Sequence, residues 1–314
     1  MVNDQLQKFM FNAAPVRGEI VLLQNTWQEV LTRRNYPAPI RAVLGEMMAA
    51  AALLSANLKF DGALVMQIMG DGPVRMLVVE CNSDLTLRAT AKFEGPIDDD
   101  ATLATLVNVG GRGRCAITLD PHDKKPGQQP YQGVVPLNDD HGNPLKAIAD
   151  VLEQYMRDSE QLETRLWLAA DDAKAAGMLL QKLPGDGGIV PHPGEHDADT
   201  WDRVCHLGST LTHDELLHAD AETLMKRLFW QENLRRFEPA RARFRCSCSR
   251  EKVGRMLRML GREEVEGILV ERGHVEIHCE FCNQRYEFDP VDAAQLFLAG
   301  PLSETMNPGT GRTH

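Results

Sequence analysis

Short runs of aliphatic and β-branched residues, separated by polar turn residues, mark the N-terminal half of the chain. Glycine, proline and aspartate bound several of them, as in Gly70-Asp-Gly-Pro, so the runs are predicted to be strands. The predicted strands are Val16–Leu23, Leu64–Met69, Val74–Glu80 and Leu85–Phe93.

A different pattern, apolar on nearly all sides, separates the first two strands. After a short segment at Trp27–Leu31, residues Ile40–Leu58 are rich in Ala and Met, which predicts a helix buried on several faces. This stretch is short for a membrane span and carries Glu46, so no membrane segment is predicted. Val151–Ala170 has apolar residues at roughly helical spacing and is predicted to cover a sheet. Because strands and helices do not alternate regularly, the expected fold class is α+β rather than a doubly wound sheet.

Changes in composition divide the chain into four predicted segments. A loop of about 25 residues, rich in Gly and Pro, begins after Pro184 and is typical of a linker. The predicted segments are an α+β core domain at 1–184, a helical linker at 185–244, a small domain with four cysteines at 245–297 and a tail at 298–314.

Within the linker, a single helix is predicted at about residues 213–237. Thr212 and Glu215 have the spacing of a capping box at its start, and Glu238-Pro239 should end it. Leucines and a phenylalanine continue an apolar stripe between these points.

The last domain is predicted to contain two short helices and a hairpin. The helices are Val253–Leu260, closed by Gly261, and Val265–Leu269, closed by Gly273; the hairpin strands are His274–Phe281 and Gln284–Phe288. A unit of about 50 residues buries too little apolar surface to be stable alone, so it needs an additional crosslink.

The bulk composition is that of a soluble protein with enough apolar material for a core. Of 314 residues, 43% are hydrophobic and 25% charged, and the formal net charge of −11 argues against a general nucleic-acid binder, which needs a basic surface. The start of the chain lacks the basic and apolar regions of a signal peptide, so a cytoplasmic location is expected. Seven cysteines in such a chain favour metal binding or redox chemistry over a disulfide scaffold.

Charge is unevenly distributed around the predicted linker helix. Asp186–Met225 has nine acidic residues and one basic residue, whereas Lys226–Arg262 has twelve basic and three acidic residues. Solvated helix faces would explain both blocks. Alternatively, the blocks attract one another and make the linker folded but only marginally stable.

Four of the cysteines have the spacing of a metal site. Cys246-Ser-Cys248 and Cys279-Glu-Phe-Cys282 supply two close pairs of soft ligands, which suit one tetrahedral zinc ion. On spacing alone, a purely structural zinc and a redox-sensitive zinc remain equally open.

Other chemistries fit the residues less well. Cys279 and Cys282 lie in a predicted hairpin, whereas a thioredoxin-type pair opens a helix. His274 and His278 are interpreted as ordinary strand residues. The remaining cysteines, interpreted as structural, are Cys81, Cys115 and Cys205. The sequence contains no Walker-type phosphate loop, dinucleotide fingerprint or G-x-S-x-G motif, and the protein is not expected to be an enzyme.

Motifs in both halves of the chain resemble the redox-regulated 33 kDa heat-shock chaperone family, over roughly residues 6 to 292. In the C-terminal part they are Phe244-Arg-Cys-Ser-Cys-Ser-Arg-Glu-Lys-Val, Leu260-Gly261 and Cys279-Glu-Phe-Cys-Asn, with Tyr286 and Phe288-Asp289. In the N-terminal part they are Tyr36-Pro, Leu44-Gly-Glu46, Leu58-Lys-Phe-Asp-Gly62, Gly70-Asp-Gly-Pro-Val74, Tyr131-Gln-Gly133, Ser159-Glu-Gln-Leu162 and Leu180-Gln-Lys-Leu-Pro184.

The resemblance implies a chaperone that holds unfolding client proteins without ATP under oxidative stress. It implies that the reduced form is inactive and holds one zinc ion on Cys246, Cys248, Cys279 and Cys282. It further implies that oxidation expels the zinc, pairs Cys246 with Cys248 and Cys279 with Cys282, unfolds the linker, and yields an active homodimer. No nucleic-acid or membrane partner is expected.

Two other functions remain as alternatives. One is a permanent zinc-ribbon module that binds nucleic acid or a protein through the arginine-rich block at Arg235–Arg262. The other is a thiol oxidoreductase that uses Cys279 and Cys282. Salt-sensitive binding of RNA or DNA would favour the first, and catalytic turnover of a disulfide substrate would favour the second.

Overall fold

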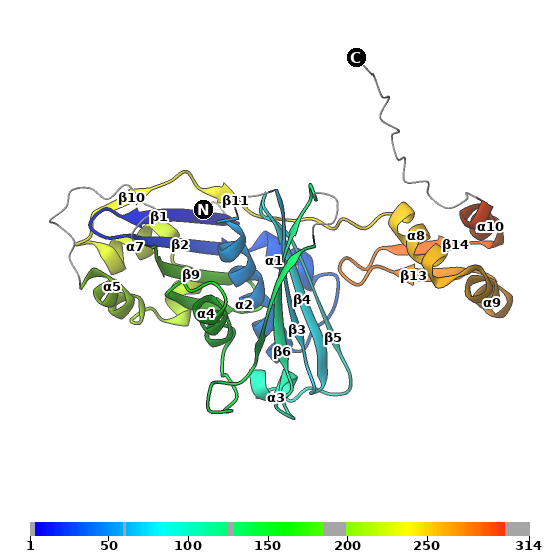
Figure 1. Cartoon of the computed structure of the whole chain (residues 1–314), viewed down its shortest axis with the longest axis horizontal. Helices are drawn as coiled ribbons and strands as arrows, with labels where there is room; N and C mark the ends of the chain where they lie inside the picture. Colours follow the sequence, from blue (N-terminus) through cyan, green and yellow to red (C-terminus); the bar gives the residue numbers. More distant parts are fainter. Residues whose placement is uncertain (1–3, 59–60, 125–128, 185–198, 299–314) are drawn as a thin grey trace, which may run out of the picture. The chain divides into compact units, whose positions relative to one another are not determined.

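The computed structural model describes residues 4–58, 61–124, 129–184 and 199–298. The chain forms two compact units, Met1–Cys246 and Ser247–His314, and its fold class is α+β as predicted (Figure 1). The glycine- and proline-rich part of the predicted linker, at 185–198, and most of the predicted tail lie outside the described residues. The assignment of 185–244 as a separate linker stays a prediction.

The first unit contains two sheets of six strands. The first has the order β10-β1-β2-β9-β8, with β11 also paired to β1, and all of its pairings are antiparallel. Its strands are β1 (Gln5–Phe11), β2 (Val16–Leu23), β8 (Thr164–Ala170), β9 (Ala175–Lys182), β10 (Leu234–Arg236) and β11 (Ala240–Arg241). Strands from both ends of this unit therefore meet in one sheet.

The second sheet has the order β12-β5-β4-β3-β6-β7. Its strands are β3 (Gly62–Met69), β4 (Val74–Asn82), β5 (Thr86–Phe93), β6 (Arg114–Pro121), β7 (Tyr131–Pro136) and β12 (Arg243–Phe244). The predicted strands at 16–23, 64–69, 74–80 and 85–93 are confirmed as β2 to β5. The edge strand β12 pairs with β5 in parallel over two residues.

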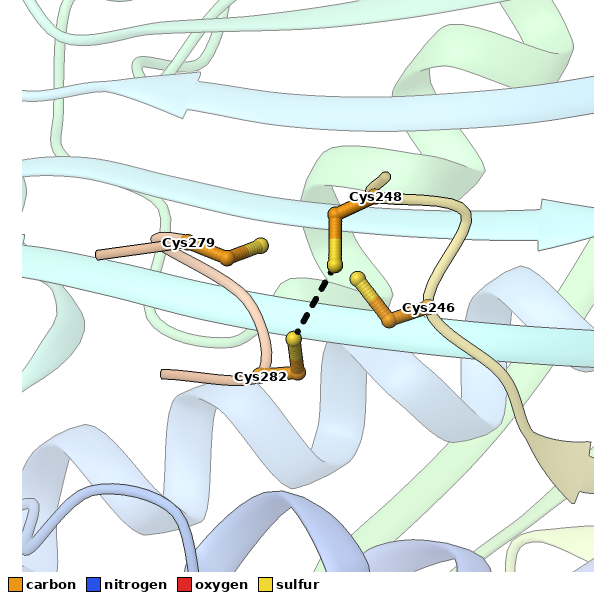
Figure 2. A group of neighbouring side chains, drawn as sticks. All are labelled: Cys246, Cys248, Cys279 and Cys282. Carbon is orange, nitrogen blue, oxygen red and sulfur yellow. Dashed lines mark hydrogen bonds between the residues drawn. The ribbon is translucent and has the colours of Figure 1, made fainter. Parts of the chain in front are cut away.

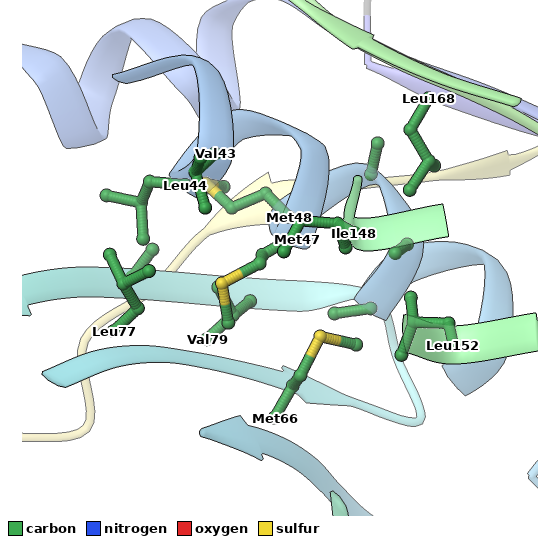
Figure 3. Close-up of a cluster of buried hydrophobic side chains, with 14 of the residues drawn as sticks. Val43, Leu44, Met47, Met48, Met66, Leu77, Val79, Ile148, Leu152 and Leu168 are labelled. Atoms are coloured by element: carbon green, nitrogen blue, oxygen red, sulfur yellow. The ribbon is translucent and has the colours of Figure 1, made fainter. Parts of the chain in front are cut away.

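Helix α2 (Ala38–Ser55) packs against both sheets and forms the centre of the core (Figure 3). Met47 and Met48 on α2 are fully buried, together with Met66 of β3. Helices α1 (Asn25–Leu31) and α4 (Ile148–Asp158) contribute to the same cluster, and α3 (Leu103–Val107) closes one end of it. Helix α2 is long and apolar enough to cross a membrane, but 72% of it is buried inside the protein, as the core helix of a folded domain would be.

Three helices cover the other face of the first sheet: α5 (Thr200–Gly208), α6 (His213–His218) and α7 (Ala221–Phe229). Phe229 of α7 contacts Phe9 and Phe11 of β1, with ring centroids 5.9 and 5.2 Å apart. Gly18 of β2 lies beneath Phe9, where a Cβ atom would be 2.1 Å from the ring. The sheet is therefore apolar on both faces, with α2 on one side and α5 to α7 on the other.

The single helix predicted at about 213–237 is wrong. The capping box at Thr212 and Glu215 is confirmed, but α6 ends at His218 and α7 begins after Asp220. Ala219 is extended, with φ −87° and ψ 148°, and the Asp220 side chain accepts a hydrogen bond from the Thr223 amide, which starts a new helix. The chain then continues as β10, because this segment pairs with β1.

The helix predicted at Val151–Ala170 is correct only in its first half. Helix α4 ends at Asp158, Gln161 has a positive φ of 57°, and β8 begins at Thr164. From Thr164 onward, buried and less buried residues largely alternate, as they do in a strand with one face on the core. Strand β8 also gains a full antiparallel partner in β9.

Ion pairs connect the acidic and basic blocks around these helices. Arg227 pairs with Glu215, and Arg236 lies 3.6 Å from Glu222. Glu222 also pairs with Lys226, at 2.8 Å. Water screens the charges of such surface pairs, so each contributes little to the stability of the fold. The blocks do attract one another, and the attraction is weak.

The second unit is small; its first two helices and its hairpin confirm the prediction, whereas its last helix was not predicted. It consists of α8 (Arg250–Leu260), α9 (Arg262–Arg272), the hairpin β13 (Val275–His278) and β14 (Arg285–Phe288), and α10 (Pro290–Leu298). Gly273 closes α9 in the left-handed conformation, with φ 77°. Its buried core is one small cluster: Leu257, Val265, Val275, Phe288 and Ala293. Such a core supports the expectation that the unit needs a crosslink.

Glu46, on the central helix, makes the stability of the first unit depend on pH. Burial, followed by the nearby Asp150 charge, raises the pKa of this carboxyl to about 7. The folded state therefore holds a proton that the unfolded chain releases near pH 4.5, and stability falls as pH rises from about 4.5 to 7.

Replacing Glu46→Gln removes this ionisation. At pH 8, we expect the free energy of unfolding of the variant to be about 1–3 kcal/mol higher than that of the reduced wild-type protein. At pH 4.5, the two proteins should differ little. Urea unfolding at both pH values measures the effect. A difference of the same size at both would contradict the assigned pKa.

Candidate metal centre

The first two cysteines lie between the end of a strand and the start of a helix. The amides of Arg243 and Arg245 donate to the carbonyls of Leu85 and Leu87, at 3.1 and 3.0 Å, and so hold the chain against β5 up to Cys246. Immediately after Cys248, the Ser249 hydroxyl accepts from the Lys252 amide and caps α8. The residues between these two fixed points have no regular secondary structure, and they carry both sulfurs.

The other two cysteines lie at the tip of the β13–β14 hairpin. The Cys279 amide donates to the Gln284 carbonyl, and the Asn283 amide donates to the Cys279 carbonyl, both at 2.9 Å. Asn283 has a positive φ of 58°, a conformation that asparagine adopts more readily than most residues. This compact turn brings Cys279 and Cys282 to one side of the tip.

The four predicted cysteines converge, as Figure 2 shows. Their sulfur atoms all lie within 4.8 Å of one another, and those of Cys248 and Cys282 are 3.4 Å apart. Four thiolates at about 2.3 Å from a tetrahedral zinc ion would have sulfurs about 3.8 Å apart. None of the four is in a disulfide, and all four are of intermediate burial. The donor set and its spacing fit a closed, four-sulfur zinc site, in which no position is left for a substrate.

Two side chains outside the cluster donate to its sulfurs. The Tyr286 hydroxyl lies 3.1 Å from Cys248 Sγ, and Arg88 Nη1 lies 3.9 Å from Cys246 Sγ. Arg88 is also paired with Glu80 at 2.5 Å, and only 17% of each side chain is exposed. Burial alone would lower the pKa of Arg88, but the Glu80 carboxylate and the Cys246 sulfur raise it above its ordinary value. Arg88 therefore remains a cation beside Cys246.

These two donors were not predicted as parts of the site. Arg88 lies 158 residues before Cys246 in the chain, and no local pattern connects them. Tyr286 belongs to the motifs that carried the family resemblance, but its hydroxyl has no signal of its own in the sequence.

The remaining cysteines and the two nearby histidines lie outside the cluster. Burial raises the pKa of the Cys81 and Cys115 thiols to about 12, and that of Cys205 to about 11. His278, in β13, is 2.8 Å from Glu276, and His274 is 3.8 Å from the same carboxylate. The histidines therefore pair with an acid on the hairpin, in line with their interpretation as strand residues.

Comparisons with known proteins agree over nearly the whole chain. The family described as Hsp33 protein matches residues 4–289. The 33 kDa chaperonin of Chromobacterium violaceum is 50% identical to this chain over 295 residues, which cover 94% of each protein. The 33 kDa chaperonin of Methylobacillus flagellatus is 46% identical over 314 residues, which cover 100% of this chain and 99% of that protein. The crystal structure of the 33 kDa chaperonin from Thermotoga maritima has the same fold, with a TM-score of 0.75, 23% identity and coverage of 94% of this chain and 98% of that one.

The thiols should fall into two reactivity classes. In native protein treated with a metal chelator at neutral pH, we expect rapid alkylation of the four clustered cysteines. Cys81, Cys115 and Cys205 should react only after denaturation, because their raised pKa values leave little thiolate. Mass spectrometry of the labelled peptides gives the counts. Rapid labelling of Cys205 would contradict its assignment.

Proposed function

The chain belongs to the Hsp33 family, and from this premise we propose that it is a redox-regulated, ATP-independent chaperone that binds unfolding proteins under oxidative stress. The chaperone activity is supported by relatives named 33 kDa chaperonin at about half identity along nearly the full chain. The observation that carries the redox part is the four-cysteine cluster, in a unit whose core is too small to be stable without a crosslink.

In the reduced, inactive form, the ligands of one zinc ion are Cys246, Cys248, Cys279 and Cys282. The bound ion would keep four sulfurs as thiolates and crosslink the two cysteine turns. In small peptides such a structural ion contributes about 10–16 kcal/mol to folding. Losing it would therefore unfold most of the second unit.

Formation of each disulfide is a two-electron oxidation, for which a peroxide is a suitable oxidant. One thiolate attacks a peroxide oxygen, the O–O bond breaks, and the sulfur becomes a sulfenic acid as hydroxide leaves. A second thiolate attacks that sulfur, the S–S bond forms and a second hydroxide leaves. Each disulfide thus consumes two thiolates, one hydrogen peroxide and two protons, and yields two waters. Pairing Cys246 with Cys248 and Cys279 with Cys282 leaves no thiolate to hold the metal.

The strands that precede Cys246 offer a path from the sulfurs to the rest of the first unit. Strands β10, β11 and β12 have three, two and two residues, and each lies at a sheet edge or pairs over only two or three positions. Such short strands are stable only while the chain on both sides is held. Once the Cys246 turn is released, we infer that these strands detach and that α5 to α7 follow.

Release of α5 to α7 would uncover an apolar surface for clients. The face of the first sheet beneath them includes Phe9, Phe11, Ile20 and Met178, all buried by the three helices. A broad apolar surface suits unfolded segments of many sequences. The same surface would favour association of two oxidised copies, in line with a homodimer. The proposed location is the cytoplasm, where reducing conditions keep the switch closed.

The central experiment follows zinc release and client protection together in reduced protein treated with hydrogen peroxide. We expect about one zinc ion per chain to be released as aggregation of a heat-unfolding enzyme is suppressed, without ATP. Cys282→Ser should bind zinc weakly, because it removes one ligand. The matched control Cys205→Ser, outside the cluster, should behave as wild type.

Each alternative function predicts a different experimental result. Zinc release without protection would indicate a structural site and contradict the proposed switch. Salt-sensitive RNA or DNA binding by the reduced protein would favour the zinc-ribbon module, and multiple turnovers of a disulfide substrate would favour the oxidoreductase.

A second prediction tests the covering helices without oxidation. Phe229→Ala removes the ring that contacts Phe9 and Phe11, which should destabilise the α7 cover by about 3–5 kcal/mol. We expect the reduced variant to suppress client aggregation while it retains its zinc. The exposed Trp230→Ala serves as the control, because 74% of that residue is accessible to solvent. Phe229→Ala protein that is destabilised and yet as inactive as the wild type would contradict client binding at this face.

A further inference from the structure

We propose that Tyr286 is a positioning residue of the switch, whose hydroxyl hydrogen-bonds to Cys248 Sγ and thereby slows both metal loss and oxidation. This inference rests on the proposed metal site and adds a determinant of its sensitivity. The oxygen and sulfur are 3.1 Å apart, a short distance for a hydrogen bond to sulfur.

The hairpin places the phenol for this contact. Tyr286 lies on β14 opposite Ile277 of β13, two residues before Phe288. Successive side chains in a strand alternate between faces, so Tyr286 and Phe288 share the face that packs on the small core. On the other face, Arg285 and Glu287 form an ion pair at 2.8 Å. The ring is thus held by packing, and its hydroxyl reaches the turn that carries Cys248.

The direction of the hydrogen bond follows from the chemistry of its partners. A phenol near neutral pH carries its proton, because its ordinary pKa is about 10, and a metal-bound cysteine is a thiolate that can only accept. The bond links β14 to the C-x-C turn, whereas the hairpin itself carries the other cysteine pair. It therefore orients Cys248 relative to Cys279 and Cys282.

Two effects follow for the reduced switch. Side chains that hydrogen-bond to metal ligands orient them, and their loss typically lowers metal affinity by about 10–100-fold. A donated hydrogen bond also withdraws electron density from the sulfur, which makes its attack on a peroxide oxygen slower. Without the Tyr286 hydroxyl, zinc should be held less tightly and the thiolate should react faster.

Tyr286→Phe isolates the hydroxyl, because the ring and its packing remain. The matched control is Tyr155→Phe, which removes a hydroxyl that donates to Glu160 at 2.7 Å rather than to a sulfur. Zinc affinity is measured by competition with a chelator in reduced full-length protein. The same proteins loaded with cobalt(II) report the sulfurs directly through the ultraviolet thiolate-to-cobalt charge-transfer band.

We expect Tyr286→Phe to bind zinc about 10–100-fold more weakly and to lose it faster under peroxide. Its charge-transfer band should move to longer wavelength, because the sulfur lone pairs rise in energy without the hydrogen bond. Tyr155→Phe should match the wild type in all three measurements.

A core variant on the same strand separates the hydrogen bond from general loosening. Phe288→Leu perturbs the small core and should lower stability while leaving the cobalt band in place. A band shift in Phe288→Leu equal to that in Tyr286→Phe would overturn the inference. Wild-type affinity and band position in Tyr286→Phe would overturn it too, with the zinc switch still standing. Failure of the wild type to bind either metal would overturn both proposals.

Discussion

Four sulfur atoms within 4.8 Å of one another are the constraint on which the second unit depends. As thiolates they repel one another strongly, so such a cluster persists only with a cation among them or with the sulfurs bonded in pairs. The two arrangements place different demands on the backbone. A zinc ion would tie the Cys246–Cys248 segment to the hairpin tip, whereas the proposed disulfides within each pair would not connect the two. The second unit, with its five-residue buried core, has little else to hold its parts in place.

Over most of its length, the first unit is stabilised by its hydrophobic core rather than by a crosslink. Its core surrounds α2 and involves two complete sheets, so it does not rely on a metal. The exceptions are the segments nearest to Cys246 in sequence: short edge strands, and three short helices with weak surface ion pairs. We therefore expect the segments nearest to Cys246 in sequence to be less stable than the core around α2. The proposed switch needs this gradient, because the core must stay folded when the helices that cover it are released.

The convergence of the four cysteines was the part of the molecule most readily predicted from sequence. The cysteines occur in two local pairs, so their convergence required only a turn and a hairpin. Strands β2 to β5 and helices α8 and α9 were predicted for a similar reason, since local patterns and glycine stops mark them. The fold class also followed from the mixed order of elements.

Errors and omissions came from partners far away in the chain. Nothing near Leu234 signals a strand, because its partner β1 is more than two hundred residues earlier. Strand β8 continues the apolar spacing of α4, and only its pairing with β9 distinguishes strand from helix. Strands β1, β6, β7 and β9 were not predicted at all. Arg88 reaches Cys246 only because β12 lies beside β5.

The central claim is that oxidation of the four cysteines releases the cover of the first sheet while leaving the core folded. Hydrogen exchange of the reduced and peroxide-treated protein tests it directly, peptide by peptide. The account predicts that amides of α5 to α7 and β10 to β12 lose protection on oxidation, while those of α2 and β2 to β5 keep theirs. Full protection of α5 to α7 in protein that has lost its zinc would contradict the account.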